Sequence, residues 1–191
     1  MVRLAKLLDI PVVCTTQNSK ALGPTDPDID LQSLGPLLLA TFDKSLFSMY
    51  VPDVQAILDA HPALTSIVIF GIESHVCVLQ TALSLLALGS KYTTHIVADG
   101  VSSCNAFEIS IALDRMRTEG AIIGTSESIA FQLMRDAASS NFKAFSKFIK
   151  DVKDSTKTAG EALLLGRVTT PVVSFGEAEV ASGGVVIKSA M

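Results

Sequence analysis

Cysteine is scarce in this sequence, which contains only three in 191 residues. Cys14, Cys77 and Cys104 lie far apart, and none belongs to a C-x-x-C pair. An odd, scattered set is a poor disulfide framework and is not a Cys-rich metal motif. We therefore expect a protein of a reducing compartment, in the first place the cytoplasm.

Positive charge and long apolar runs are lacking as well. Lys and Arg number 15 against 19 Asp and Glu, which gives a net charge of −4. Because nucleic-acid binding depends on a basic face, we expect no nucleic-acid partner. No apolar run reaches the roughly 18 residues that a membrane-spanning helix requires, so we expect no membrane partner either.

Signatures of cofactors and metals are also missing. The sequence contains no G-x-G-x-x-G motif and no P-loop, so no nucleotide cofactor is predicted. Its histidines, His61, His75 and His95, are too widely spaced for a recognisable ligand motif. We expect neither a cofactor nor a metal.

What the sequence does contain is a regular alternation of helical patterns with short apolar strands. Such alternation indicates βαβ units and a mainly parallel sheet with helices on both faces, which is the α/β fold class. We expect strands at 10–16, 64–72, 94–101 and 121–127, and helices at 2–9, 51–61, 77–89, 108–120, 127–137 and 141–152.

The pattern changes near residue 153. Residues 1–153 are predicted to form one domain, and residues 154–191 an irregular C-terminal tail with scattered Gly, Ser and Thr. Within this tail we expect at most a short strand at Pro171–Phe175.

Cys77 follows the apolar strand SIVIFGI, at the point where the chain turns into a helix. Ligands of parallel sheets bind at the carboxyl ends of the strands, and a helix start stabilises a thiolate. Position alone also allows the simpler interpretation that Cys77 is a small buried hydrophobic residue.

The segment GIESHVCVLQTA, residues 71–82, favours the nucleophile because it resembles the signature of the isochorismatase-like cysteine hydrolases. The segments TTQNSKALGPTDPDI, KSLFSM and DGVSSCN are similar to those of the isochorismatase domain-containing branch. The resemblance runs from about Leu4 to Val152.

The resemblance implies a three-layer α/β/α fold with strand order 3-2-1-4-5-6. It also implies a small-molecule substrate and a homo-oligomer. Proteins of this branch occur in the cytosol, the mitochondrion or the nucleus, so the last two are alternatives to a cytoplasmic location.

The resemblance further implies roles for individual residues. Cys77 matches the nucleophile, and Lys44 matches the lysine that stabilises the thiolate and the developing negative charge. The peptide bond Ile72–Glu73 matches a non-proline cis bond, with oxyanion-hole N–H groups at or near Glu73 and Cys77. Taken without the resemblance, Lys44 would be a surface charge.

Four further residues are interpreted from their positions. Gln17 ends a predicted strand and is expected to face the substrate pocket, and Phe47 is expected in its wall. His75 is a poor candidate for a general base, because its side chain, two residues before the cysteine, is expected to point elsewhere. Asp99 is expected to cap the segment GVSSCN, while Cys14 and Cys104 are expected to be packed or incidental thiols.

The third member of the family triad, an aspartate at the end of the first strand, has no match. The sequence begins inside the helix that follows that strand, and Asp9 lies on the wrong side of a turn. Strand 1 is central in the family order, so its loss would leave two strand edges unpaired. Either an upstream segment supplies the strand, or a tail segment such as TPVVSF or GGVVIK replaces it.

Two functions follow from these observations. The first is a cysteine hydrolase of a small amide, ether or ester-like metabolite, impaired as the sequence stands. The second is a non-catalytic scaffold or oligomeric interaction protein that uses the same fold.

Overall fold

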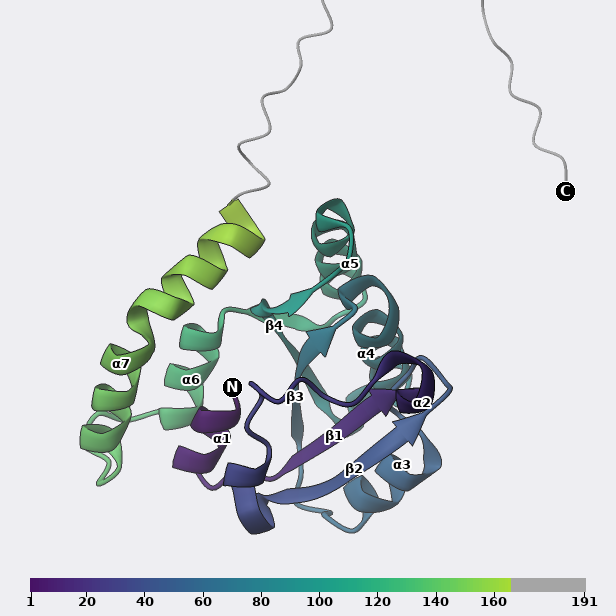
Figure 1. Ribbon diagram of the computed structural model, residues 1–191. Helices are drawn as coiled ribbons and strands as arrows, with labels where there is room; N and C mark the ends of the chain where they lie inside the picture. Colours follow the sequence, from purple (N-terminus) through teal and green to yellow (C-terminus); the bar gives the residue numbers. More distant parts are fainter. Residues whose placement is uncertain (166–191) are drawn as a thin grey trace, which may run out of the picture.

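The computed structural model describes residues 1–165, in which helices alternate with strands along the chain (Figure 1). The strands are β1 (Val12–Gln17), β2 (Leu38–Lys44), β3 (Ser66–Ile72), β4 (Thr93–Ser102) and β5 (Ile122–Gly124). The helices are α1 (Val2–Leu7), α2 (Ser19–Leu22), α3 (Pro52–Asp59), α4 (Leu79–Leu86), α5 (Ala106–Thr118), α6 (Ser126–Met134) and α7 (Phe142–Gly160). Short helical turns are η1 (Gln32–Leu37), η2 (Ser74–Val78), η3 (Gly89–Lys91) and η4 (Glu161–Leu165).

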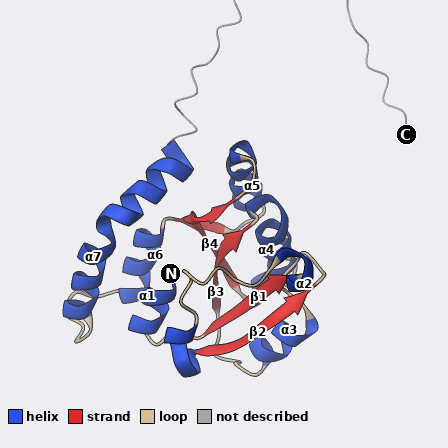
Figure 2. Ribbon diagram, in the orientation of Figure 1, coloured by secondary structure: helices blue, strands red, loops and turns tan. Residues whose placement is uncertain are grey.

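All strand pairs are parallel, as the alternation of helices and strands predicts. The strands form two separate groups, β1 with β2 and β3 with β4 and β5 (Figure 2). Within the described residues, β1 and β3 therefore each have one edge without a strand partner. This is the place at which the family order has strand 1, and the absence of that strand stays a prediction.

The larger core lies around β4, whose residues are buried on both faces. Ile96 and Val97 are completely buried although they point to opposite sides of the strand. Helices α4 and α5 cover this region with Ala82, Leu85 and Met116. The apolar run Ile96, Val97 and Ala98 of β4 is therefore explained by burial on both faces of the strand.

A second, smaller core joins α1, α6 and α7. Phe145 of α7 is fully buried and contacts the ring of Phe131 edge to face, with ring centroids 5.0 Å apart. Leu4 and Met134 complete this cluster. It holds the first helix of the chain against the last ones, which Figure 1 shows side by side.

The structure differs from the predictions in the residues after 153 and in strand β2. The tail predicted to be irregular from residue 154 is helical as far as Leu165, because extending a formed helix adds one hydrogen bond per residue. Leu163 and Leu164 then pack against the larger core. The possible strand at Pro171–Phe175 and the segments TPVVSF and GGVVIK lie outside the described residues.

Strand β2 was not predicted from the sequence. In the structure, the exposure of its residues alternates strictly from one residue to the next, as in a strand with one buried face.

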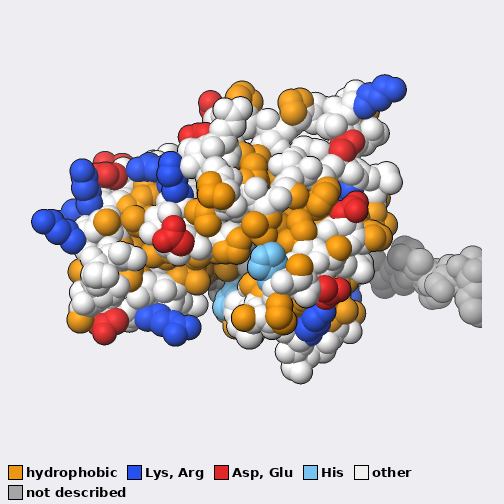
Figure 3. Space-filling view, turned by 90° about the horizontal axis from the view of Figure 1, so that it is seen from below, with side chains coloured by type: hydrophobic (Ala, Val, Ile, Leu, Met, Phe, Trp, Pro, Cys, Tyr) orange, Lys and Arg blue, Asp and Glu red, His pale blue; other side chains and the backbone are white. Residues whose placement is uncertain are grey.

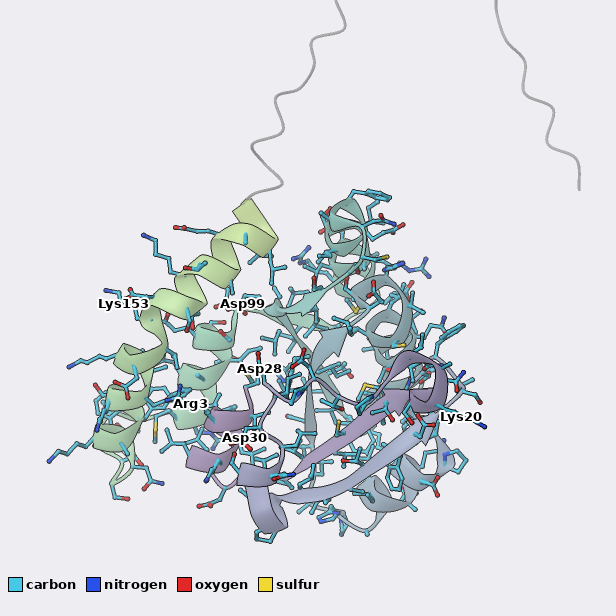
Figure 4. All side chains as sticks on the ribbon, viewed as in Figure 1. Arg3, Lys20, Asp28, Asp30, Asp99 and Lys153 are labelled. Atoms are coloured by element: carbon cyan, nitrogen blue, oxygen red, sulfur yellow. The ribbon has the colours of Figure 1, made fainter. Side chains whose placement is uncertain are left out.

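Asp99 caps a different element from the one predicted. Its carboxylate accepts hydrogen bonds from the backbone N–H and the hydroxyl of Ser126, at 2.5 and 2.6 Å. Asp99 therefore stabilises the start of α6 and not the segment GVSSCN (Figure 4). Sequence distance explains the error, because the two residues meet only through the parallel pairing of β4 with β5.

The lower face of the molecule, as it is oriented in Figure 1, carries both hydrophobic and basic side chains. Hydrophobic side chains form a band across the middle of this face, and Lys and Arg side chains gather on the side of α7 (Figure 3). None of the helices within residues 1–165 is both long enough and apolar enough to cross a bilayer.

His95 of β4 makes stability depend on pH. Burial lowers the pKa of its imidazole below the ordinary value of 6.5, and its Nδ1 is buried without a partner among the described residues. The unfolded chain therefore binds more protons at His95 as the pH falls below about 6.5. We expect the free energy of unfolding to fall between pH 7 and pH 5, as urea titrations at each pH would measure.

Replacing the imidazole by an amide removes this dependence at one site. His95→Gln should lose less stability than the unchanged protein between pH 7 and pH 5, because glutamine binds no proton in either state. The matched control is His61→Gln, at an exposed histidine. Equal pH slopes for the unchanged protein and His95→Gln would contradict this assignment.

Candidate active site

Three side chains from distant parts of the sequence meet at the carboxyl ends of the strands. Gln17 is the last residue of β1 and Lys44 the last of β2, and the two are direct partners in the parallel register. Cys77 lies in η2, the turn that leads from β3 into α4. Parallel strands bring their carboxyl ends to one edge, which explains why these residues meet.

Lys44 is buried, with 7% of its surface exposed, and its ammonium is surrounded by oxygen acceptors. Nζ donates to Gln17 Oε1 at 2.5 Å, to the Phe47 carbonyl at 2.9 Å and to the Leu46 carbonyl at 3.1 Å. Three acceptors match the three N–H bonds of an ammonium group. Lys44 is therefore held as a fixed positive charge.

Cys77 lies beside this charge. Its sulfur is 3.8 Å from Lys44 Nζ and 3.8 Å from Gln17 Oε1, and the residue is buried. An ammonium at this distance from a thiolate is worth about 1 kcal/mol at the dielectric constant of water and about 4 kcal/mol at an effective value of 20. The lysine is therefore placed to stabilise negative charge that develops on the sulfur during a reaction.

Gln17 connects the two groups. While its Oε1 contacts both Lys44 and Cys77, its Nε2 donates to the Ser45 carbonyl at 2.7 Å. The sequence predicted that Gln17 faces the site, and the structure adds that it fixes the position of the lysine. Gln17 is therefore a positioning residue in addition to an expected pocket residue.

The loop that supplies the carbonyl acceptors is tied to the helix that carries the cysteine. Thr81 Oγ1 donates to the Cys77 carbonyl at 2.6 Å and accepts the backbone N–H of Met49 at 2.8 Å. The hydroxyls of Ser48 and Ser84 lie 2.9 Å apart. The sequence assigned Thr81 no role, although it stands in the quoted signature segment. Only the fold shows what it contacts.

Phe47 takes part through its backbone. Its carbonyl binds Lys44, whereas 48% of the residue's surface is exposed. A role of its ring in the pocket wall therefore stays a prediction.

The turn after β3 brings a second set of polar groups together. The peptide bond Ile72–Glu73 is cis, and this is the bond that the resemblance marked. The Glu73 carboxylate accepts the backbone N–H of Cys104 at 2.6 Å, and the hydroxyls of Ser74 and Ser103 are hydrogen-bonded. These contacts join the β3 turn to the loop after β4.

His75 belongs to this second set. Its Nδ1 lies 2.9 Å from Ser103 Oγ and 3.8 Å from Glu73 Oε2. No hydrogen bond joins His75 to Cys77 in the described part of the chain, which agrees with its rejection as a base. Cys104 is exposed, so of the two expectations for this thiol, packed or incidental, packing does not apply.

No carboxylate within residues 1–165 is hydrogen-bonded to Cys77 or Lys44. Asp43 is adjacent to Lys44 in the sequence but is exposed, because neighbouring residues of a strand point to opposite faces. The backbone N–H of Ser19, at 2.8 Å, and the hydroxyl of Thr16, at 2.9 Å, lower the pKa of the Asp43 carboxyl below its ordinary value. Asp43 thus fastens α2 to the strand ends and does not reach the sulfur.

A parallel α/β fold with a cysteine at a strand-to-helix turn and a buried lysine beside it is the arrangement that the resemblance to the isochorismatase-like hydrolases implies. The family model described as the isochorismatase domain matches residues 1–128. The chain therefore belongs to the isochorismatase family.

Individual relatives are similar over most of the chain. The secreted isochorismatase effector Isc1 of Phytophthora sojae is 46% identical over 152 residues, which is 79% of this chain and 71% of the relative. Isochorismatase domain-containing protein 2 of Bos taurus is 42% identical over 151 residues, 79% of this chain and 70% of the relative. The solved MAR1 ribonuclease of Caenorhabditis elegans is 35% identical with a TM-score of 0.67, over 78% of this chain and 73% of that chain.

The lysine charge gives a direct test at the cysteine. In Lys44→Met the alkylation of Cys77 by iodoacetamide at neutral pH should slow at least about fivefold, because the thiolate loses a charge worth 1 kcal/mol or more. Peptide mass spectrometry over a time course measures this rate. Circular dichroism checks folding, since the change leaves buried acceptors unpaired.

The matched control is Lys20→Met, because Lys20 is exposed on α2 and points away from the molecule in Figure 4. Its Cys77 alkylation rate should equal that of the unchanged protein. A folded Lys44→Met protein with an unchanged rate would show that Lys44 does not activate the cysteine.

Proposed function

We propose that the protein is a cysteine hydrolase of a small amide, ether or ester-like metabolite, with Cys77 as the nucleophile. The observation that carries the proposal is the 3.8 Å contact between Lys44 Nζ and Cys77 Sγ in a buried site. Membership of the isochorismatase family supports a hydrolase-type function.

For an amide or ester substrate, the chemistry has two stages. The Cys77 sulfur attacks the carbonyl carbon, the carbonyl oxygen takes the negative charge, and the amine or alcohol leaves with one proton. A water molecule then attacks the thioester, which releases a carboxylic acid and restores the thiol. Lys44 stabilises the negative charge of the thiolate and of the tetrahedral intermediate.

Backbone N–H groups near Glu73 and Cys77 are the expected donors to the developing oxyanion. They stand at the beginning of the helical segment formed by η2 and α4, where N–H groups lack partners in the preceding turn. Such donors typically contribute about 3 kcal/mol each to stabilisation of the transition state. This assignment is part of the proposal.

Proton transfer at the sulfur requires a base, and residues 1–165 place no carboxylate there. Lys44 already uses its N–H bonds on three oxygens and acts as a charge, not as a base. Acylation of a preformed thiolate needs no base, whereas attack by water on the thioester does. We therefore expect this chain to acylate faster than it deacylates.

Small substrates fit this site better than polynucleotides. The solved relative from Caenorhabditis elegans is a ribonuclease, yet this chain carries a net charge of −4 and its nucleophile is buried. Binding of an RNA backbone requires basic side chains along its path. Labelled RNA is therefore included as a comparison substrate, and we expect no cleavage.

An activated ester tests the function. With p-nitrophenyl acetate the full chain should release a rapid burst of about one equivalent of nitrophenolate, followed by slower turnover, because the acyl-enzyme accumulates. Mass spectrometry of the quenched protein should place the acetyl group on Cys77. Cys77→Ser should lose both the burst and the adduct.

The matched controls are Cys14→Ser and Cys104→Ser, which should keep the burst. If Cys77 is acetylated no faster than Cys14 and Cys104, the proposed hydrolase function is overturned and the non-catalytic scaffold is favoured. Cleavage of labelled RNA that disappears in Cys77→Ser would instead overturn the small-molecule substrate class.

A further inference from the structure

A cluster of three metal-binding side chains lies beside the candidate active site. Glu73, His75 and Cys104 each offer one ligand atom, and these atoms lie within 4.8 Å of one another. Glu73 and His75 come from the turn after β3, and Cys104 comes from the loop after β4. Cys77 and Lys44 do not belong to the cluster.

The chemical character of the three ligands points to one class of ion. A carboxylate, an imidazole and a thiolate together form a ligand set typical of Zn²⁺, whereas Mg²⁺ and Ca²⁺ prefer oxygen alone. Tetrahedral zinc places its ligand atoms about 3.3–3.8 Å apart, given bond lengths of about 2.0–2.3 Å. His75 Nδ1 and Glu73 Oε2 are already 3.8 Å apart.

Neighbouring groups hydrogen-bond to the ligand side chains but leave lone pairs free for an ion. The Glu73 oxygen Oε2 accepts the Cys104 backbone N–H at 2.6 Å, which orients the carboxylate and leaves the second lone pair of Oε2 for an ion. Among residues 1–165, the hydrogen-bond partner of His75 Nδ1 is the Ser103 hydroxyl, at 2.9 Å, and that hydroxyl keeps Ser74 as a second partner. A hydrogen bond to a ligating carboxylate is the usual outer support of a metal site.

Exposure of Cys104 gives an ion access from solvent. Glu73 and His75 are only partly buried, so binding requires little rearrangement of the core. Three protein ligands leave the fourth tetrahedral position to water or another small ligand.

We propose that Glu73, His75 and Cys104 form a Zn²⁺ site that links the turn after β3 to the loop after β4. The site is separate from the proposed nucleophile and does not depend on hydrolase activity. It also differs from a site built on histidine spacing, which the sequence lacks, because its cysteine is 29 residues from its histidine.

Cobalt replaces zinc as a spectroscopic probe of the site. The full chain carrying Cys77→Ser, which removes the other candidate thiolate, should bind one equivalent of Co²⁺ and show a thiolate-to-metal absorption band. Added Zn²⁺ should displace the cobalt and abolish the band. Competition with a chromogenic chelator then gives the zinc affinity.

Each ligand has a matched variant in the Cys77→Ser background. Cys104→Ser should abolish the thiolate band, and Cys104→Ser, His75→Gln and Glu73→Gln should each weaken zinc binding at least about tenfold, since even loss of an outer-shell contact costs 10–100-fold. Cys14→Ser should change neither. Circular dichroism of each variant without metal establishes that the fold is retained.

Two outcomes would overturn the proposal. One is the absence of stoichiometric Co²⁺ or Zn²⁺ binding at micromolar metal. The other is a thiolate band that survives Cys104→Ser but disappears in Cys14→Ser, which would place the ion elsewhere.

Discussion

The buried ammonium of Lys44 is the constraint on which the site depends. A charged group this far from solvent is stable only when its N–H bonds have acceptors, and one side chain and two carbonyls supply them. Meeting that requirement fixes Gln17 at the end of β1 and the chain after β2. Besides these oxygen acceptors, the ammonium has the Cys77 sulfur as a neighbour.

The fold supplies this arrangement through the parallel pairing of its strands. The register sets Gln17 beside Lys44, and the turn after β3 delivers the cysteine to the same edge. Thr81 then ties the start of the helix to the loop that follows Lys44. The residues around the charge thus stand at strand ends and on the turns and loops that follow them.

Much of this could be predicted from the sequence, because apolar strands and amphipathic helices have distinct periods. The α/β class, Cys77 at a strand end and the family followed from such patterns and from one signature segment. Strand β2 was missed although Gly35 and Pro36 precede it, because its first residues are all apolar and do not alternate with polar ones. The helical extent of 154–165 was missed because packing by Leu163 and Leu164 overrides weak local preference. The grouping of Glu73, His75 and Cys104 could not be predicted, since it depends on how two loops meet in space.

The Lys44 charge, and not exposure, is proposed to control cysteine reactivity in this protein. Cys104 is exposed and Cys77 is buried, so accessibility alone ranks Cys104 first. Limited alkylation of the unchanged chain with iodoacetamide near pH 6.5, followed by peptide mass spectrometry, compares all three cysteines in one sample. We expect Cys77 to be modified first, and modification of Cys104 or Cys14 ahead of Cys77 would contradict control by the Lys44 charge.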